Sequence, residues 1–238
     1  MNSDTRQDEA PDGGADGVYD TWSSRYGVDD PRASGYVSPF WFRQERRLIL
    51  DLVGPRPGRV LDVACGFGLV TLPLAARAFE VFGVDYNALA CRGAARNGLR
   101  AVRGNAFALP FPDDTFETIT CIEFLQQCER EQVAALLGEL ARIAAPGGRL
   151  ILVWRNHRAP LHRLALRISD ALGRPRVPLN EHPFENVAAM AQRAGLGIEK
   201  AGAIFPPFRQ LFEDRRGVAA GVLGTGFLVV LRKAGEIP

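Results

Sequence analysis

Two short stretches of this sequence combine small residues with carboxylates in an order that suits a nucleoside-containing ligand. The first, residues 60–68 (VLDVACGFG), is an apolar run that passes through Asp62 into a small-residue turn. This order is typical of a buried strand, a tight loop and a helix start, where backbone N–H groups can approach a ligand closely. A second apolar run, residues 81–84, ends in Asp85, seventeen residues after Gly68. The spacing favours a βαβ unit whose second strand presents a carboxylate to ribose hydroxyls.

Alternating strands and helices would position these residues. The apolar runs predict strands at 59–63, 80–84, 100–103, 116–121 and 148–154, and the periodic segments predict helices at 42–53, 68–78, 87–97 and 130–144. Such alternation predicts an α/β fold, in which a parallel sheet with right-handed crossovers carries helices on both faces. Ligands of these sheets bind at the carboxyl ends of the strands. Four polar residues fall at or just beyond those ends: Asp62, Asp85, Asn105 and Glu123.

The overall composition excludes several classes of protein. A net charge of +2 gives no global argument for nucleic-acid binding. No apolar stretch reaches the roughly eighteen residues that a membrane-spanning helix needs, and the acidic N-terminus is unlike a signal peptide. The four cysteines form no CxxC pair, so we expect free thiols in a reducing compartment, the cytoplasm. They are Cys65, Cys91, Cys121 and Cys128.

A basic stretch follows the fifth predicted strand. Residues 155–180 hold six arginines against one acid, Asp170, and apolar residues from Leu161 to Leu172 recur at helical spacing. The pattern predicts a basic amphipathic helix inserted after that strand. Three interpretations stay open: a solvated face, attraction of an anionic acceptor, and peripheral contact with an anionic membrane through 155–176, with anion selection ranked slightly above membrane contact.

These motifs resemble those of class I S-adenosylmethionine-dependent methyltransferases, in particular the small-molecule group that includes the ubiquinone and menaquinone methyltransferases. Four stretches match in order: 60–68, 81–87, 108–117 and 142–150. The resemblance implies a Rossmann-like, doubly wound, seven-stranded and mostly parallel sheet with a helical lid insertion. It also implies S-adenosylmethionine as the cofactor.

The resemblance further implies roles for the residues of the first two strand ends. Ala64, Gly66 and Gly68 would approach the methionine part of the cofactor, and Asp62 would order that loop. Asp85 would accept hydrogen bonds from both ribose hydroxyls. Ala64 stands where the family commonly has glycine.

The remaining cofactor contacts are implied in the same way. Tyr86 would flank the adenine, while Asn105 and Ala106 would meet its edge. Glu123 would lie where the fourth strand opens onto the sulfonium. The family usually has Asp where this chain has Asn105, so we expect weaker binding there, since an amide oxygen still accepts but carries no charge.

The chain divides into a predicted disordered tail, 1–17, and a single methyltransferase domain, 18–238. In that domain, 18–53 would form an N-terminal lid, in which Tyr19 and Tyr26 match the family's aromatic positions. The cofactor-binding half would be 59–154 and the basic insertion 155–183. Residues 184–238 would complete the sheet with a helix at 184–195 and two mutually antiparallel strands, 197–204 and 224–232.

The expected reaction is methyl transfer to a small organic acceptor at oxygen or carbon, and anionic and lipid-like acceptors both fit. The protein would mainly align the reacting atoms. A hydroxyl acceptor also needs a base, for which His157, His182 and Glu123 are the candidates. Glu123 could equally pair with an arginine. No histidine is spaced with Cys or acids as metal ligands are, so no metal is expected.

Three alternatives compete with this interpretation. A nicotinamide enzyme would need a third glycine where Thr71 stands. A polynucleotide substrate is disfavoured, because the Asn/Asp-Pro-Pro-aromatic motif of adenine methyltransferases is missing at 121–124. A non-catalytic cofactor-binding or regulatory module with the same fold remains open. The oligomeric state does not follow from the sequence.

Overall fold

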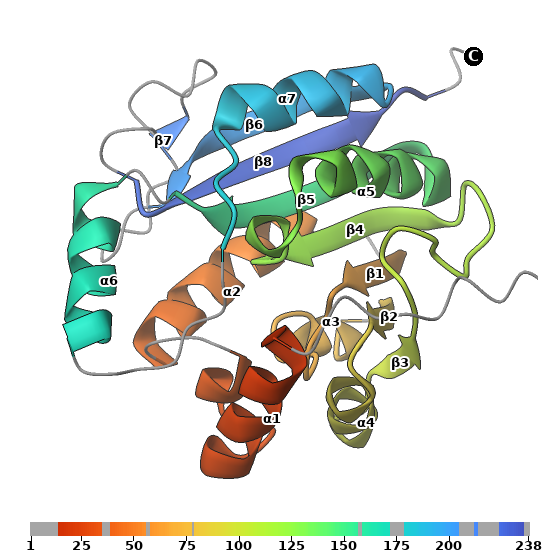
Figure 1. Ribbon diagram of the computed structural model, residues 1–238. Helices are drawn as coiled ribbons and strands as arrows, with labels where there is room; N and C mark the ends of the chain where they lie inside the picture. Colours follow the sequence, from red (N-terminus) through yellow and green to blue (C-terminus); the bar gives the residue numbers. More distant parts are fainter. Residues whose placement is uncertain are drawn as a thin grey trace, which may run out of the picture.

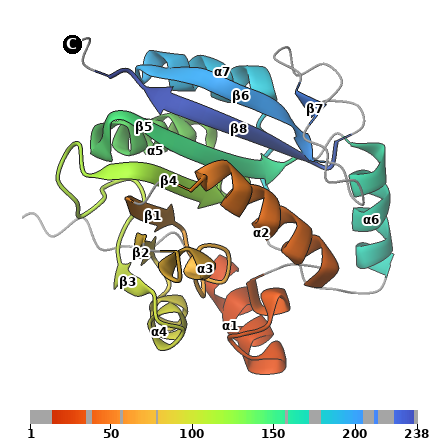
Figure 2. The same ribbon diagram turned by 180° about the vertical axis from the view of Figure 1, so that it is seen from behind.

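The computed structural model describes residues 14–34, 39–55, 58–77, 79–156, 159–171, 179–204, 212–213 and 224–235. In chain order its elements are α1 (Gly14–Tyr26), the 3-10 helix η1 (Pro31–Ser34), α2 (Pro39–Val53), β1 (Arg59–Val63), α3 (Leu72–Ala75), β2 (Glu80–Asp85), α4 (Ala88–Arg96), β3 (Arg100–Arg103), β4 (Phe116–Ile122), the 3-10 helix η2 (Leu125–Gln127), α5 (Arg130–Ile143), β5 (Ala144–Arg155), α6 (Pro160–Ala171), α7 (Phe184–Arg193), β6 (Leu196–Ile204), β7 (Phe212–Glu213) and β8 (Gly226–Lys233). Figures 1 and 2 show their arrangement.

One sheet organises the molecule, with the strand order β3-β2-β1-β4-β5-β8-β6-β7. Strands β1 to β5 pair with one another in parallel, and β8 runs antiparallel to both β5 and β6. The predicted mostly parallel, doubly wound sheet is therefore confirmed, with β7 as a two-residue addition at its edge. Because β1 pairs with both β2 and β4, the strand order reverses beside it, and the ligand-binding crevice of such sheets lies at that point.

Helices cover both faces of this sheet. Helices α5 and α7 pack on one face through residues such as Leu140 and Val187, and α2 and α3 pack on the other through Ile49 and Leu74. The two views from opposite sides show these layers (Figures 1 and 2). Burial on both faces explains why the central strands are apolar runs rather than alternating patterns.

The structure corrects the predicted ends of two segments. Helix α1 begins at Gly14, inside the stretch expected to be a disordered tail; residues 1–13 lie outside the described part. The helix predicted over 68–78 covers only Leu72–Ala75. Its first part is a turn instead, because Ala64, Gly66 and Gly68 all have positive φ and Pro73 is confined to the first helical turn.

The basic insertion forms a helix, α6, as predicted. Figure 1 shows it beyond the carboxyl end of β5, outside the two helical layers. In the part of the chain that the structure describes, no helix is long and apolar enough to cross a membrane.

Candidate functional site

The loop after β1 carries three residues in left-handed conformations. Ala64 has φ +56°, Gly66 +53° and Gly68 +74°. Such values cost glycine little but strain an alanine, and backbone strain of this kind often accompanies function. The loop is tied to the end of β2, because the Cys65 N–H donates to the Val84 carbonyl at 3.1 Å. The sequence therefore folds here into a rigid turn at the carboxyl edge of the sheet.

The glycine loop after β1 packs closely against the neighbouring residues of the sheet. A Cβ on Gly68 would lie 2.8 Å from Leu99 Cδ2, and one on Gly83 would lie 2.7 Å from Cys65 Sγ. Both distances are shorter than real Cβ contacts, so a side chain at either position would force Leu99 or Cys65 to move. By contrast, among the described residues a Cβ on Gly66 would have only Ser34 Oγ within 4 Å, at 3.6 Å. The loop is less closely packed at Gly66 than at Gly68, and Ser34 of η1 borders it there.

The N-terminal segment covers the glycine loop. Ala33 is fully buried and packs in one apolar cluster with Phe67, Ala90 and Val28. The ring of Tyr26 lies under two guanidinium groups, those of Arg25 and Arg32, at 5.4 and 4.5 Å from the ring centre. This placement agrees with a lid over the site. Tyr19 belongs to α1, but its side chain lies outside the described part of the structure.

Asp62 is buried beneath the loop and joins it to the sheet. Its two carboxylate oxygens accept hydrogen bonds from Thr71 Oγ1 at 2.9 Å and Thr120 Oγ1 at 2.7 Å. Burial raises the pKa of Asp62 from 3.8 to about 6, while the two threonine hydroxyls oppose that rise. Asp62 therefore links β1 to Thr71, just before α3, and to Thr120 on β4. The sequence reasoning did not find its partners Thr71 and Thr120.

Asp85 ends β2 beside the glycine loop and is half-buried. Its Oδ2 accepts from the Gly66 N–H and its Oδ1 from the Asn87 N–H, both at 2.8 Å. A carboxylate oxygen can accept more than one hydrogen bond. The arrangement suits a sugar with two neighbouring hydroxyls, which would lie between the two loops.

The residues expected at an adenine ring lie on the next two loops. Tyr86 is 38% exposed, and Arg103 lies over its ring at 5.2 Å from the centre. Asn105 Oδ1 accepts from the Phe107 N–H at 2.9 Å, so it also shapes its own loop. Ala106 is half-buried against the core. These positions can border a flat ring, with one amide lone pair left at Asn105.

Glu123 lies just past the end of β4 with φ +58°, a strained value for a side chain of its size. Its carboxylate accepts from Gln126 Nε2 at 2.9 Å and forms an ion pair with Arg155, which ends β5. Pairing with an arginine was one of the two interpretations of Glu123, and the pair lies at the sheet edge that opens toward the cofactor region. Sequence reasoning did not find Gln126 or pick out Arg155 as the partner.

Of the two candidate histidines, His157 and His182, the structure describes only His182. His182 is buried, with its Nε2 2.9 Å from the Cys128 carbonyl oxygen, and its own carbonyl accepts from Trp154 Nε1 at 2.8 Å. This geometry favours a packing role over that of a base. His157 lies outside the described residues. Within the described part, no group of three or more His, Cys, Asp or Glu side chains could hold a metal ion.

The four cysteines are free thiols. Burial raises the pKa of all of them, that of Cys128 to about 12. Thiols with raised pKa values are poor nucleophiles at neutral pH, so the glycine-loop residue Cys65 is expected to act through packing.

Comparisons with known proteins agree with this geometry. The family model described as a methyltransferase domain matches residues 61–152. The chain is 33% identical over 153 residues to a demethylmenaquinone methyltransferase of Renibacterium salmoninarum, covering 63% of this chain and 62% of that protein. It is 32% identical over 175 residues to a ubiquinone/menaquinone biosynthesis C-methyltransferase of Azotobacter vinelandii, covering 68% and 66%. The chain spans less than two thirds of the length of the curated relatives that it matches, 62, 55 and 52% for three of them.

A solved structure matches over most of the chain. The crystal structure of the PH0226 protein from Pyrococcus horikoshii superposes with a TM-score of 0.66 and 19% identity, covering 90% of this chain and 97% of that one. At this identity the likeness establishes the fold alone.

Proposed function

We propose that the chain is a class I S-adenosylmethionine-dependent methyltransferase, which transfers a methyl group from that cofactor to a small organic acceptor. The observation that carries the proposal is Asp85, whose carboxylate ends β2 beside the glycine loop and accepts from the Gly66 N–H at 2.8 Å. The residues present fit a nucleoside sulfonium, since a carboxylate and a glycine loop with positive φ values lie together where β1 and β2 end.

When bound, the sulfonium supplies a methyl group that is already activated. The chain's own residues then have to orient and enclose it. Asp62, held by Thr71 and Thr120, fixes the loop under the methionine part. The segment around Ala33 covers the loop and keeps water out. In-line attack needs the reacting atoms about 3–3.5 Å apart, so rigid positioning of this kind is the main contribution of the protein.

For the acceptor we propose an electron-rich, hydroquinone-like ring that is methylated at carbon. The names of the relatives, demethylmenaquinone and ubiquinone/menaquinone methyltransferases, support this class. Arg155 can hold an anionic ring oxygen at the sheet edge, and Glu123 beside it can accept a proton. In the reaction the ring carbon bonds to the methyl group as the sulfur–carbon bond breaks, and the ring then releases a proton. Methylation at an acceptor oxygen is the alternative outcome.

The full chain, incubated with S-adenosylmethionine and a reduced short-chain naphthoquinone, should release S-adenosylhomocysteine and a product heavier by one methylene unit. Fragmentation of that product distinguishes a carbon-bound from an oxygen-bound methyl group. Cofactor binding by titration without turnover of naphthoquinols, phenols or enols would instead support the non-catalytic module. Absence of cofactor binding would overturn both.

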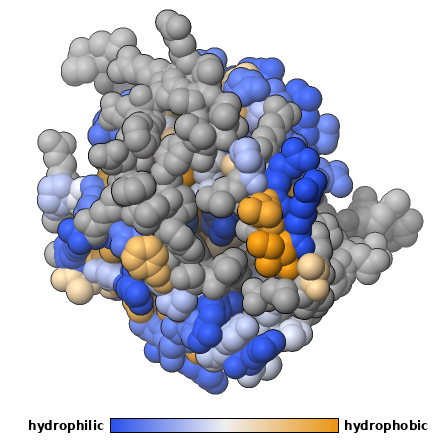
Figure 3. Space-filling model, turned by 90° about the vertical axis from the view of Figure 1, so that its left-hand side faces the viewer, coloured by the Kyte–Doolittle hydropathy of each residue, from blue (hydrophilic) through white to orange (hydrophobic). Residues whose placement is uncertain are grey.

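We further propose that α6 rests on an anionic lipid surface and so gives access to a lipid-like acceptor. Leu164 and Ile168 lie one turn apart on this helix and are 54% and 53% exposed. The neighbouring Arg163 and Arg167 are also exposed and could reach lipid phosphates. Figure 3 views the molecule from the side that carries α6 in Figure 1, and apolar atoms there adjoin strongly hydrophilic ones.

We place the protein in the cytoplasm. The four free cysteines support this compartment, because oxidising environments favour disulfides. Thiol labelling of the protein in intact and lysed cells tests the assignment.

A further inference from the structure

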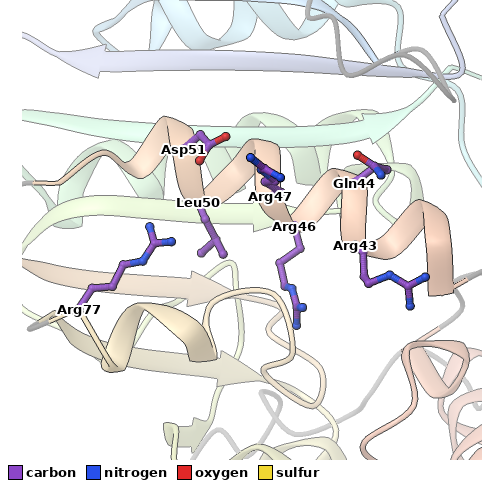
Figure 4. Close-up of a pocket in the computed structure, with 7 residues that line it drawn as sticks. All are labelled: Arg43, Gln44, Arg46, Arg47, Leu50, Asp51 and Arg77. Carbon is purple, nitrogen blue, oxygen red and sulfur yellow. The ribbon is translucent and has the colours of Figure 1, made fainter.

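A groove lined with arginines lies between α2 and the segment that follows α3. Its volume is about 560 Å³. Its lining consists of Arg43, Gln44, Arg46, Arg47, Leu50, Asp51 and Arg77. Figure 4 shows Arg77 reaching toward α2, on which Leu50, Arg46 and Arg43 project toward the same side. Four arginines against a single aspartate leave an excess of three positive charges.

These charges are poorly compensated within the protein. Arg43, Arg47 and Arg77 are exposed and have no ion-pair partner among the described residues. Arg43 and Arg47 are one helical turn apart, as are Arg43 and Arg46, and like charges at this spacing repel. An anion in the groove would relieve that repulsion.

Arg46 differs from the other three arginines because it is already held in place. Its Nη1 donates to the Leu69 carbonyl at 3.4 Å, and its guanidinium lies 5.0 Å from the centre of the Phe42 ring. The group is half-buried and retains further N–H donors. A fixed guanidinium loses little conformational freedom when it binds an anion, so Arg46 can act as the anchor of the site.

The chemistry of the lining selects the kind of anion. Guanidinium groups match the oxygens of phosphate in a bidentate geometry and stay charged at all relevant pH values. A single phosphate would engage one or two of them, whereas a chain of two or three linked phosphates can bridge several. The groove has room for such a chain, and Leu50 offers only a small apolar surface.

We propose that this groove is a binding site for a soluble oligophosphate, a diphosphate or triphosphate group, separate from the methyl-transfer site. Because Arg46 also holds Leu69, the residue after the glycine loop, the bound anion would lie one hydrogen bond away from that loop. The site does not depend on the identity of the methyl acceptor.

Isothermal titration of the full chain with inorganic triphosphate, diphosphate and monophosphate tests the proposal. Affinity should rise in that order and fall with added salt, because the contacts are ionic. The double variant Arg43→Gln/Arg47→Gln should lose about tenfold to a hundredfold in triphosphate affinity. The variant Arg43→Lys/Arg47→Lys keeps the positive charges but loses the bidentate guanidinium geometry. Its triphosphate affinity should lie between those of the unaltered protein and the glutamine double variant.

A matched control is available on α4. Arg92 and Arg96 are exposed and have the same spacing as Arg43 and Arg47, so Arg92→Gln/Arg96→Gln removes the same charge elsewhere. This variant should bind triphosphate like the unaltered protein. Equal losses in both double variants, or equal affinities for monophosphate and triphosphate, would overturn the proposal by indicating unspecific charge attraction.

A lipid headgroup is the other source of phosphate, and vesicles of phosphatidylglycerol distinguish it. The Arg43→Gln/Arg47→Gln variant should keep its vesicle binding while it loses triphosphate binding. Loss of vesicle binding in that variant, with no triphosphate binding by the unaltered protein, would assign the groove to the membrane and refute a soluble ligand. Circular dichroism of each variant checks that it is folded.

Discussion

Asp85 is the residue on which cofactor affinity should depend most, because its carboxylate is shared between the glycine loop and the expected ribose. Asp85→Ala should weaken S-adenosylmethionine binding by about tenfold to a hundredfold, which corresponds to roughly 1–3 kcal/mol for unpaired hydrogen-bonding groups. Titration calorimetry measures the change. Asp113→Ala serves as the control, since that carboxylate is 70% exposed and pairs with Arg142. Equal affinities of both variants would refute the ribose role.

Asp62 should make the stability of the fold depend on pH in the acid range. Its pKa is raised by burial to about 6 in the folded state, against 3.8 as the ordinary value. The folded state therefore holds the proton more tightly, so this group's contribution to stability is full below about pH 4 and is lost as the pH rises through about 6. Roughly two pKa units at about 1.4 kcal/mol each give up to about 3 kcal/mol.

Asp62→Asn cannot titrate and should remove this slope. Urea unfolding of both proteins at several values between pH 4 and 7 gives the difference in free energy of unfolding. Other carboxylates have lowered pKa values, such as Glu139 beside Arg142, and change the stability with pH in the opposite sense. They are present in both the unaltered protein and the Asp62→Asn variant, so their effect drops out of the difference in free energy of unfolding. If the difference in free energy of unfolding between the unaltered protein and Asp62→Asn did not change with pH, the raised pKa of Asp62 would be contradicted.

At the scale of the elements, the join between β1, its glycine loop and β2 depends on Gly83. A methyl group there would lie 2.7 Å from Cys65 Sγ and 2.8 Å from Leu99 Cδ2. Gly83→Ala should destabilise the fold by about 1–3 kcal/mol through overpacking and should weaken cofactor binding, because Cys65 has to move. Urea unfolding and titration calorimetry measure the two effects.

Two companion variants sharpen this test. Adding Cys65→Ala to Gly83→Ala should restore part of the stability, since the sulfur is removed. Gly138→Ala in α5 has open space around the new methyl group and should instead stabilise by roughly 0.5–1 kcal/mol. Destabilisation of similar size at both glycines would argue against close packing as the cause.

Helix α6 provides the element on which the proposed lipid contact depends. Leu164→Gln/Ile168→Gln should reduce binding to phosphatidylglycerol vesicles at least tenfold, because burying each apolar side chain contributes about 1.5–3 kcal/mol. Cosedimentation measures binding. Val102→Gln is the control, as Val102 is 43% exposed on β3, on the opposite side of the molecule from α6 (Figure 1). Undiminished binding of the double variant would exclude α6 as the contact.

At the scale of the whole molecule, cofactor binding should stabilise the fold, because the site joins β1, β2 and the N-terminal segment. A ligand at about one hundred times its Kd adds roughly 2.7 kcal/mol, which for a chain of this size corresponds to about 5–10 °C in Tm. Thermal unfolding with S-adenosylhomocysteine measures this shift. Asp85→Ala should need a higher ligand concentration for the same shift, and an unchanged Tm at millimolar ligand would speak against a formed site.

Much of the sheet was predictable because its signals are local. The strands at 59–63 and 100–103 match the structure, since a glycine bounds each run, Gly58 before the first and Gly104 after the second. The helix at 68–78 was overextended, because the prediction gave no weight to Pro73, which fits only the first turn of a helix. Helix α1 (Gly14–Tyr26) was not predicted at all, because its first residues, Gly14–Gly17, have little apolar content and its helical form depends on context.

For the candidate site as well, local features were predictable and long-range contacts were not. The positions of Asp62, Asp85 and Glu123 at strand ends were predictable from apolar runs that stop at an acid. Their partners were not, since Thr120 is 58 residues from Asp62 and Arg155 is 32 residues from Glu123. The contact of the His182 ring with the Cys128 carbonyl could not be predicted either, because the two residues are 54 positions apart.

The amino-acid order alone determined which residues end each strand and hence which carboxylates meet at one edge of a parallel sheet, because strand periodicity and turn chemistry act over a few neighbours. Only the folded chain decided which hydroxyl, guanidinium or backbone group each carboxylate contacts, and how far each is buried. Those pairings join segments that are dozens of residues apart, so they depend on the packing of whole elements.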